Sequence, residues 1–268
     1  MAHILGLKPG LRVAIITTFA RCLLIRANPV ATAPGTDLAH LAAVKLCRRF
    51  FIFIVMTKAS LTPDEEFANA LLSHAPRYGV NLSADDAARL LDYYKLVATW
   101  NPRLHLVAPC APDEFAIRHL LESLFALPQF TPGARVLDIG SGAGLPIIPC
   151  LIARGDVSAT LFESSPKKSV FLREALRRVG LENQARVITA RFEKTSAPQA
   201  EFVTCRALEH FTEMLSKITV WSPPYSTLLL FGSEKLRARI ESLAPTFTAL
   251  HIPASDRRSL FVISRPSL

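Results

Sequence analysis

Two hydrophobic patterns follow one another along this chain. Between residue 62 and about residue 128, apolar residues recur every three or four positions, as Leu90, Leu91, Tyr94 and Val97 do, which is the spacing of one face of a helix. From residue 134 onward, short continuous apolar runs alternate with amphipathic stretches. Such alternation predicts buried parallel strands connected by helices. We therefore expect a helical lead-in followed by an α/β sheet.

Helix start signals divide the lead-in into three helices. The sequence Thr62–Glu65 combines a capping hydroxyl, a proline at the first helical position and acids in the first turn, and it predicts a helix to about His74. Ser83 predicts a second helix that ends near Trp100, and Pro112 opens the third.

Seven apolar segments fit buried strands. They are residues 134–140, 158–163, 185–190, 201–207, 226–232, 246–252 and 258–264. Helices are expected between them over residues 145–153, 166–179 and 208–221. The predicted fold class is α/β and Rossmann-like, with a mostly parallel seven-stranded sheet covered by helices on both faces.

Residues 1–55 differ from the rest of the chain. They hold seven Lys or Arg and one acid, and their apolar runs are too short or too interrupted for the ~20 residues that cross a bilayer. Three interpretations stay open: a segment that is not natively made, a disordered basic arm for RNA, and a membrane-surface or targeting segment. We favour the first, because the sequence from Met56 reads as an ordinary cytosolic N-terminus. The expected divisions are then 1–55, a lead-in over 56–130 and a core over 131–268.

Composition narrows the choice of partner and compartment. The 268 residues carry a formal net charge of +9, which suits a polyanion such as RNA. The five cysteines lie far apart without the spacing of metal ligands, so no metal site is expected. Scattered cysteines favour buried thiols in a reducing cytoplasm, and we expect a monomer without a membrane anchor.

Three glycines at alternate positions follow the first predicted strand. In "VLDIGSGAGLP", Gly140, Gly142 and Gly144 lie just beyond the strand end, and Asp138 precedes them. An open parallel sheet binds its ligand beyond the carboxyl ends of its strands, where glycine lets the backbone approach closely. A dinucleotide fingerprint would need glycine at Leu145, which disfavours a nicotinamide dehydrogenase.

The GxGxG spacing resembles motif I of the class I S-adenosylmethionine-dependent methyltransferases. Glu163 ends the next predicted strand, where these folds place an acid that accepts hydrogen bonds from ribose hydroxyls. A solvated strand-end acid is the alternative, and the glycine loop upstream favours the binding role.

Several further stretches resemble the rRNA small subunit methyltransferase G family, also called GidB. They are "WNPRLHLV" (100–107), "RHLLESL" (118–124), "VLDIGSGAGLPIIP" (136–149), "LFESSPKKSVFL" (161–172), "GLENQARVITARFE" (180–193) and "CRAL" (205–208). The resemblance implies a class I methyltransferase that uses S-adenosyl-L-methionine to methylate N7 of one guanine in 16S rRNA of the small ribosomal subunit.

The resemblance also implies a set of site residues. Gly140 and Leu145 would line the cofactor pocket, Phe192 and Glu193 would flank the adenine, and Arg206 would reach the cofactor. The full expected cofactor set is Asp138, Gly140, Gly142, Gly144, Leu145, Glu163, Phe192, Glu193 and Arg206.

Contacts to RNA phosphates are expected from basic residues near the carboxyl edge of the sheet. The candidates are Arg118, His119, Lys167 and Lys168. A packing role for His119 and a solvated helix start at the two lysines are the alternatives. Guanine N7 carries a lone pair and no proton, so its attack needs no general base, and the sequence names no single residue as catalytic.

The chain departs from the family pattern at several positions, including Glu163 in place of the usual Asp and "RRSLFV" (257–262) in place of a late "RHLV" stretch. His105 stands in place of the usual Asn, Glu122 in place of Asp, Pro166 in place of Gly, and Phe231 in place of a lysine on the fifth strand. The replacement of that lysine by Phe231 leaves the identity of the methyl acceptor open. A methyltransferase of a small molecule or protein, and a non-catalytic RNA-binding protein that retains the fold, therefore stay open. Cofactor binding and the identity of the methyl acceptor separate these hypotheses.

Overall fold

The computed structural model describes residues 61–243 and 246–264, which form one unit. The hypotheses about residues 1–55 lie outside the described residues. Within the described ranges, no helix combines the length and apolar character that a membrane crossing requires.

The lead-in helices begin where the start signals predict. Helix α3 (Pro63–His74) and helix α4 (Ala84–Leu104) each open with a capping box, in which the hydroxyl of Thr62 or Ser83 accepts a backbone N–H three residues later. Helix α4 passes the predicted end at Trp100 and includes Pro102 before His105 closes it in a left-handed conformation. Pro102, near the end of this long helix, therefore does not end it.

The third lead-in helix is interrupted by a π-helical turn. It consists of α5 (Pro112–Phe115), the π-helical turn η2 (Ala116–Leu121) and α6 (Glu122–Leu124). Short 3₁₀ turns η1 (Ala75–Tyr78) and η3 (Leu127–Gln129) complete the lead-in. Isolated π-helical turns are frequent at functional sites, and the sequence pattern gave no sign of this one.

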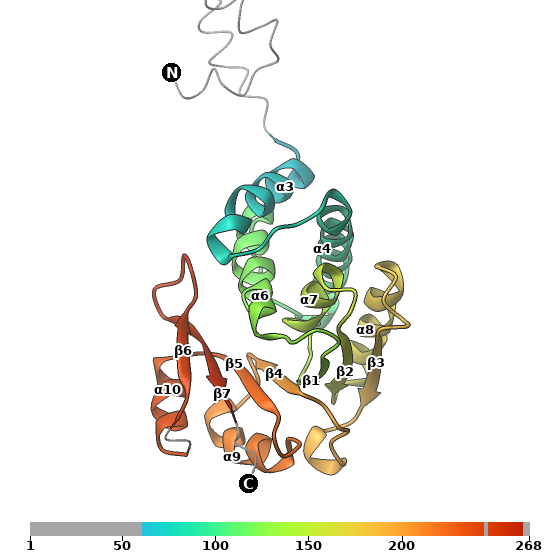
Figure 1. Ribbon diagram of the computed structural model, residues 1–268. Coiled ribbons are helices and arrows are strands. Elements are labelled where there is room, and N and C mark those ends of the chain that lie inside the picture. The colour runs from blue at the N-terminus through green and yellow to red at the C-terminus, as the bar shows by residue number, and fades with distance from the viewer. Residues whose placement is uncertain (1–60, 244–245, 265–268) are drawn as a thin grey trace, which may run out of the picture. The chain divides into compact units, whose positions relative to one another are not determined.

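Seven strands form one sheet in the described part of the chain (Figure 1). They are β1 (Arg135–Ile139), β2 (Ser158–Glu163), β3 (Ala185–Thr189), β4 (Phe202–Arg206), β5 (Thr227–Ser233), β6 (Thr248–His251) and β7 (Arg258–Ile263). Their order is β3-β2-β1-β4-β5-β7-β6, and β7 runs antiparallel to both neighbours. The predicted mostly parallel sheet is confirmed, and the single antiparallel strand makes it a mixed one.

Helices cover both faces of the sheet (Figure 1). The helices are α7 (Ile147–Ala153), α8 (Pro166–Arg178), α9 (Phe211–Trp221) and α10 (Glu234–Glu241), with a 3₁₀ turn η4 (Phe192–Lys194). Successive strand residues point to opposite faces, so Val136 packs in one apolar core with α7, α8 and the lead-in. Leu137 packs in a second core with α9 and α10. The lead-in therefore shares its core with one face of the sheet.

Helix α10 was not predicted from the sequence. It spans eight residues, most of them charged or exposed, and only Leu236 and Ile240 are buried. Two apolar positions four residues apart give a weak periodic signal.

Candidate functional site

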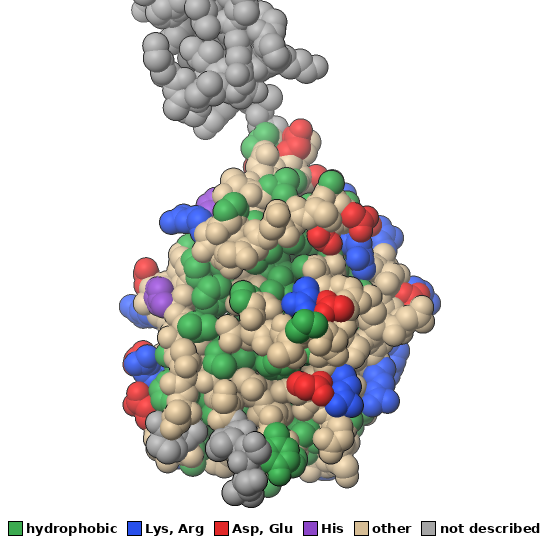
Figure 2. Space-filling model, viewed as in Figure 1, with side chains coloured by type: hydrophobic (Ala, Val, Ile, Leu, Met, Phe, Trp, Pro, Cys, Tyr) green, Lys and Arg blue, Asp and Glu red, His purple; other side chains and the backbone are tan. Residues whose placement is uncertain are grey.

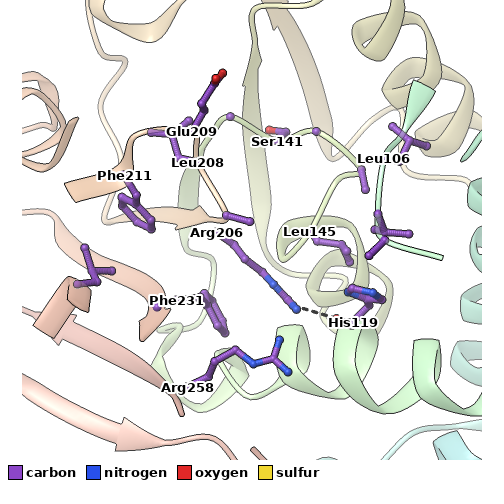
Figure 3. Close-up of a pocket in the computed structure, with 18 of the residues that line it drawn as sticks. Leu106, His119, Ser141, Leu145, Arg206, Leu208, Glu209, Phe211, Phe231 and Arg258 are labelled. Carbon is purple, nitrogen blue, oxygen red and sulfur yellow. Dashed lines mark hydrogen bonds between the residues drawn. The ribbon is translucent and has the colours of Figure 1, made fainter. Parts of the chain in front are cut away.

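The carboxyl ends of the parallel strands meet at one edge of the sheet. The strand order reverses between β1 and β4, which is the topological switch point where such sheets bind ligands. Because β7 is antiparallel, its first residue, Arg258, pairs with Ser233 at the end of β5 and lies at the same edge. A pocket of about 1140 Å³ opens there, lined by the loop after β1 and by residues from β2, β4, β5, β7 and the lead-in (Figure 3).

The glycine loop is held from the next strand. The N–H groups of Gly140 and Ser141 both donate to the carbonyl oxygen of Phe162, at 2.9 and 3.1 Å. The N–H of Gly142 donates to Glu163 Oε2 at 2.9 Å. These bonds fix the shape of the loop without a ligand, so the site is preorganised.

Two of the glycines permit close approaches. A Cβ atom on Gly140 would lie 2.6 Å from Leu208 Cδ1, and φ at Gly140 is +67°. A Cβ on Gly144 would lie 2.4 Å from Ile148 Cδ1. Gly140 thus lets the segment after β4 close over the loop, while Gly144 lets α7 pack beneath it.

Glu163 connects the loop to helix α8. It is 6% exposed, and its Oε1 accepts the N–H of Ser165 at 2.7 Å while its Oε2 accepts Gly142. Each carboxylate oxygen keeps a further lone pair, and the side chain lines the pocket. Glu163 can therefore accept two more hydrogen bonds from a ligand.

Asp138 lies beneath the loop rather than in the pocket lining. Its side chain is fully buried, Oδ1 accepts a 2.6 Å hydrogen bond from Thr204 Oγ1, and Oδ2 has no partner among the described residues. Burial raises the pKa of this carboxyl to about 7, and the bond from Thr204 opposes the rise.

Two buried tyrosines of the lead-in each hold a backbone carbonyl of a loop that contributes to the pocket. The hydroxyl of Tyr93 in α4 donates to the carbonyl of Ala143 in the glycine loop at 2.5 Å. The hydroxyl of Tyr78 in η1 donates to the carbonyl of Pro253, between β6 and β7, at 2.8 Å. The lead-in helices thus position both sides of the site.

Arg206, the last residue of β4, is anchored by the π-helical turn. Its Nη1 donates to the carbonyl of His119 at 3.2 Å and to Ser123 Oγ at 3.0 Å. Its Nη2 donates to the carbonyl of Arg118 at 2.7 Å and to Glu122 Oε2 at 3.0 Å. With both terminal nitrogens engaged, Arg206 joins the sheet to the lead-in along the wall of the pocket.

Glu122 binds two guanidinium groups at once. It is 2% exposed and pairs through Oε2 with Arg206 and through Oε1 with Arg258 Nη2 at 2.7 Å. Burial raises the pKa of Glu122, and the two arginines oppose the rise. The Arg206 guanidinium also lies 5.8 Å from the centre of the Phe231 ring, within cation–π range.

His119 projects toward the same part of the pocket (Figure 3). Burial lowers its pKa to about 3, and the nearby Arg206, Arg118 and Arg258 act in the same direction. The imidazole is therefore neutral at pH 7, with one nitrogen that donates and one that accepts. It contributes no positive charge toward a phosphate.

The structure brings only part of the expected set together in the pocket. The expected residues in its lining are Gly140, Gly142, Leu145, Glu163, Arg206, His119 and Lys168. Those outside the lining are Asp138, Gly144, Phe192, Glu193, Arg118 and Lys167. Phe192 packs against Trp221 at a ring distance of 5.3 Å, and Glu193 lies at the surface.

The basic candidates do not form one patch. Arg118 is ion-paired with Glu114 one helical turn away, and Lys167 is exposed at the start of α8. On the face that Figure 2 shows, Lys and Arg side chains lie interspersed with acids. Phosphate binding by Arg118, His119, Lys167 and Lys168 stays a prediction.

Sequence reasoning missed several lining residues. Arg258, Leu208, Phe211 and the loop over residues 105–109 all contribute to the pocket. The position of Arg258 follows from the antiparallel course of β7, which the residue pattern did not reveal. Leu208 could have been found, because it follows the predicted fourth strand by two residues.

The strand order, the glycine loop after β1 and the acid at the end of β2 together define a Rossmann-like methyltransferase. The family model for rRNA small subunit methyltransferase G, GidB, matches residues 86–255. This chain therefore belongs to the rRNA small subunit methyltransferase G family.

Curated relatives support the same family. The chain is 43% identical over 157 residues to a Ribosomal RNA small subunit methyltransferase G from Xanthomonas campestris pv. campestris (strain B100), which covers 58% of this chain and 70% of that relative. It is 38% identical over 138 residues to the protein of that name from Neisseria gonorrhoeae (strain NCCP11945), with 52% of this chain and 66% of that relative covered.

Among solved structures, the chain resembles the mitomycin 7-O-methyltransferase MmcR, with a TM-score of 0.49 and 17% identity over 76% of this chain and 69% of that one. It also resembles an RNA methyltransferase from Salinibacter ruber in complex with S-adenosyl-L-homocysteine, with a TM-score of 0.42 and 12% identity over 55% of this chain and 89% of that one. The fold assignment rests on the strand order and not on these likenesses.

Proposed function

We propose that this chain transfers a methyl group from S-adenosyl-L-methionine to N7 of a specific guanine in 16S rRNA. The observation that carries the proposal is the family match over residues 86–255, which includes the glycine loop, Glu163 and Arg206. The relatives named above carry the small ribosomal subunit in their names. The acceptor and the cofactor of this chain are inferred from that membership.

The residues present fit S-adenosyl-L-methionine. Gly140 and Gly142 both line the pocket: a Cβ on Gly140 would collide with Leu208, whereas a Cβ on Gly142 would meet only the carbonyl oxygen of Gly140, at 3.7 Å. Glu163 keeps acceptor capacity for two hydroxyl groups, which is what a ribose requires. Leu145 and Leu208 supply apolar surface at the same loop.

In this reaction the protein has to position the two reactants, and no proton has to be transferred. The cofactor supplies an electrophilic methyl group on a positively charged sulfur. Guanine N7 has a free lone pair, so the protein has to hold it in line with that methyl, at roughly 3–3.5 Å. A pocket that excludes water favours a step in which positive charge leaves the sulfur.

We also propose that the enzyme acts as a monomer in the cytoplasm. The described cysteines are free thiols, with Cys150 and Cys205 buried, as in proteins of a reducing compartment. The small ribosomal subunit is the expected partner. The lead-in over residues 56–130 and the core over residues 131–268 would act as one body, since they share an apolar core.

Transfer of a labelled methyl group tests the proposal. The full chain is incubated with labelled S-adenosyl-L-methionine and small subunits that lack the modification, with already modified subunits as the control. We expect label in the 16S rRNA of the unmodified subunits alone. Label in a small molecule or protein instead would assign another acceptor, and cofactor binding without transfer would favour a non-catalytic RNA-binding protein.

A further inference from the structure

The pocket is larger than one ligand needs. At about 1140 Å³ it exceeds the roughly 300–1,000 Å³ of typical small-molecule sites. The glycine loop and Glu163 occupy the side formed by β1 and β2. The opposite side is formed by β4, β5 and β7, together with the π-helical turn η2 and the segment between β6 and β7. It is lined by His119, Arg206, Phe231, Ile252 and Arg258, and we call these five residues the acceptor lobe.

Arg258 is held in place but keeps one open donor. Its Nη2 binds Glu122 Oε1 at 2.7 Å, and its Nε donates to Ser255 Oγ at 3.3 Å. No hydrogen bond engages its Nη1 within the described residues, and the side chain is 33% exposed and lines the pocket. By contrast, both terminal nitrogens of Arg206 are engaged. Arg258 Nη1 is thus a fixed donor available to a ligand.

The surroundings of this donor suit a flat, aromatic ligand. The ring of Phe231 lies in the same part of the pocket (Figure 3), and Ile252 also belongs to the lining. Glu122 neutralises one of its two guanidinium partners, so the cluster retains one positive charge, and His119 adds none. One open donor beside apolar and aromatic groups fits the carbonyl of a nucleobase better than a phosphate, which prefers several donors.

We propose that the acceptor lobe binds the guanine that is methylated, with Arg258 Nη1 donating to guanine O6 and the base lying against Phe231. This inference rests on the proposed function and adds its specificity-determining residue.

The chemistry of the purine supports a single donor at this place. Arginine commonly binds guanine through both O6 and N7, and that fork would occupy the N7 lone pair. Because only one terminal nitrogen of Arg258 is open, it can bind O6 and leave N7 free to attack the methyl group. Adenine presents an amino donor where guanine has O6, so the same arginine would reject it.

The test combines a change in the protein with a change in the base. Arg258→Lys retains a cation for Glu122 but removes the guanidinium fork, and Arg257→Lys at the exposed neighbour outside the pocket lining is the matched control. Small subunits are assembled with guanine or with 2-aminopurine at the methylated position. The second base keeps N7 but lacks O6. Methyl transfer gives kcat/KM for each pair, and calorimetry gives the Kd for S-adenosyl-L-methionine.

We expect Arg258→Lys to lower kcat/KM on guanine by about 10- to 100-fold, the range for a lost charged hydrogen bond. For wild type, kcat/KM should be lower on 2-aminopurine than on guanine by a similar factor. For Arg258→Lys, kcat/KM on the two bases should be nearly equal. Cofactor affinity should be unchanged in both variants, and Arg257→Lys should match wild type throughout.

Three results would overturn the inference. One is Arg258→Lys with wild-type activity on guanine. Another is that Arg258→Lys lowers kcat/KM by the same factor on guanine and on 2-aminopurine, which would mean that Arg258 donates to the RNA backbone. The third needs no variant: wild type that methylates 2-aminopurine as well as guanine. If wild type methylates no guanine at all, the proposed function fails and the inference fails with it, which separates that case from the other three.

Discussion

Gly140 is the residue at which the glycine loop comes closest to the segment after β4. Gly140→Ala places a Cβ 2.6 Å from Leu208 Cδ1, whereas Gly180→Ala meets nothing within 4 Å at nearly the same φ of +66°. Both variants carry the backbone cost of a positive φ, about 1–2 kcal/mol. Only Gly140→Ala forces a side chain that lines the pocket, that of Leu208, to move.

We therefore predict similar losses of stability for the two variants but different cofactor binding. Gly140→Ala should raise the Kd for S-adenosyl-L-methionine by about tenfold or more, an energy comparable to one lost contact, and Gly180→Ala should leave it unchanged. Urea unfolding and calorimetry measure the two effects. Equal affinities in the two variants would show that the cofactor does not lie against Gly140.

Asp138 links stability to pH. Its pKa is about 7 in the folded protein, against an ordinary value near 4, so between these values the folded state holds a proton that the unfolded state has released. Stability should therefore fall as pH rises from about 4 to about 7, by up to about 4 kcal/mol from this group, and should change no further above pH 7.

The variant Asp138→Asn isolates this effect. It keeps the shape of the side chain and the partner position at Thr204 but cannot titrate. We predict that the difference in unfolding free energy between wild type and Asp138→Asn changes over the interval from pH 4 to pH 7 and is constant above it. Urea titrations at pH 5, 6, 7 and 8 measure it, and a constant difference at all four values would refute the assignment.

At the scale of elements, the lead-in helices act through two tyrosines. Tyr93 in α4 holds the carbonyl of Ala143 on the cofactor side, and Tyr78 in η1 holds the carbonyl of Pro253 on the side that carries Arg258. Replacing either with phenylalanine leaves a carbonyl without its partner, at a cost of about 1–3 kcal/mol. The two variants are thus controls for each other.

We predict that they affect different ligands. Tyr93→Phe should raise the Kd for the cofactor and leave the KM for ribosomal subunits nearly unchanged, and Tyr78→Phe should do the reverse. Calorimetry and steady-state methyl transfer separate the two quantities. If each variant raises both the Kd for the cofactor and the KM for ribosomal subunits, the tyrosines stabilise the fold without positioning the two loops separately.

Much of this architecture could be predicted from residue patterns. Buried on both faces, the strands appear as continuous apolar runs, and the capping boxes at Thr62 and Ser83 mark their helices. The π-helical turn could not be predicted, because its spacing of apolar residues does not differ from that of an α-helix. It exposes carbonyls of Arg118 and His119 that anchor Arg206, a contact across more than 80 residues of sequence.

The same limit applies to the site. The glycine loop follows β1 directly and Glu163 is the last residue of β2, so their position at the pocket could be predicted from the sequence. Arg258 lines the pocket from β7, and Tyr93 in α4 supports it through the carbonyl of Ala143, so their roles depend on strand direction and helix packing. Short-range residue patterns carry no information about such contacts. A motif at the end of a strand can be placed at the pocket as soon as the sheet is known to be parallel.

At the scale of the whole molecule, every described site residue and both apolar cores lie within residues 61–264. Residues 1–55 carry seven basic residues and one acid. We predict that a chain starting at Met56 retains kcat/KM on small subunits within about twofold, because we interpret residues 1–55 as a segment that is not natively made.

Assays at several salt concentrations distinguish a segment that is not natively made from a basic arm for RNA. If residues 1–55 are a basic arm for RNA, their removal should raise KM and flatten the dependence of binding on salt, because fewer counterions are released. That outcome would replace our preferred interpretation of the segment with the second one.

Cleavage of the RNA chain at the modified base tests most directly whether N7 of a guanine in 16S rRNA is the methyl acceptor. Methylation at N7 makes the base sensitive to borohydride reduction, after which aniline cleaves the RNA chain at that nucleotide. Small subunits treated with the enzyme and cofactor should give one new cleavage site in 16S rRNA, at a guanine, and none without cofactor. Incorporated label without such cleavage would contradict methylation at N7 and would direct the search to another atom or another acceptor.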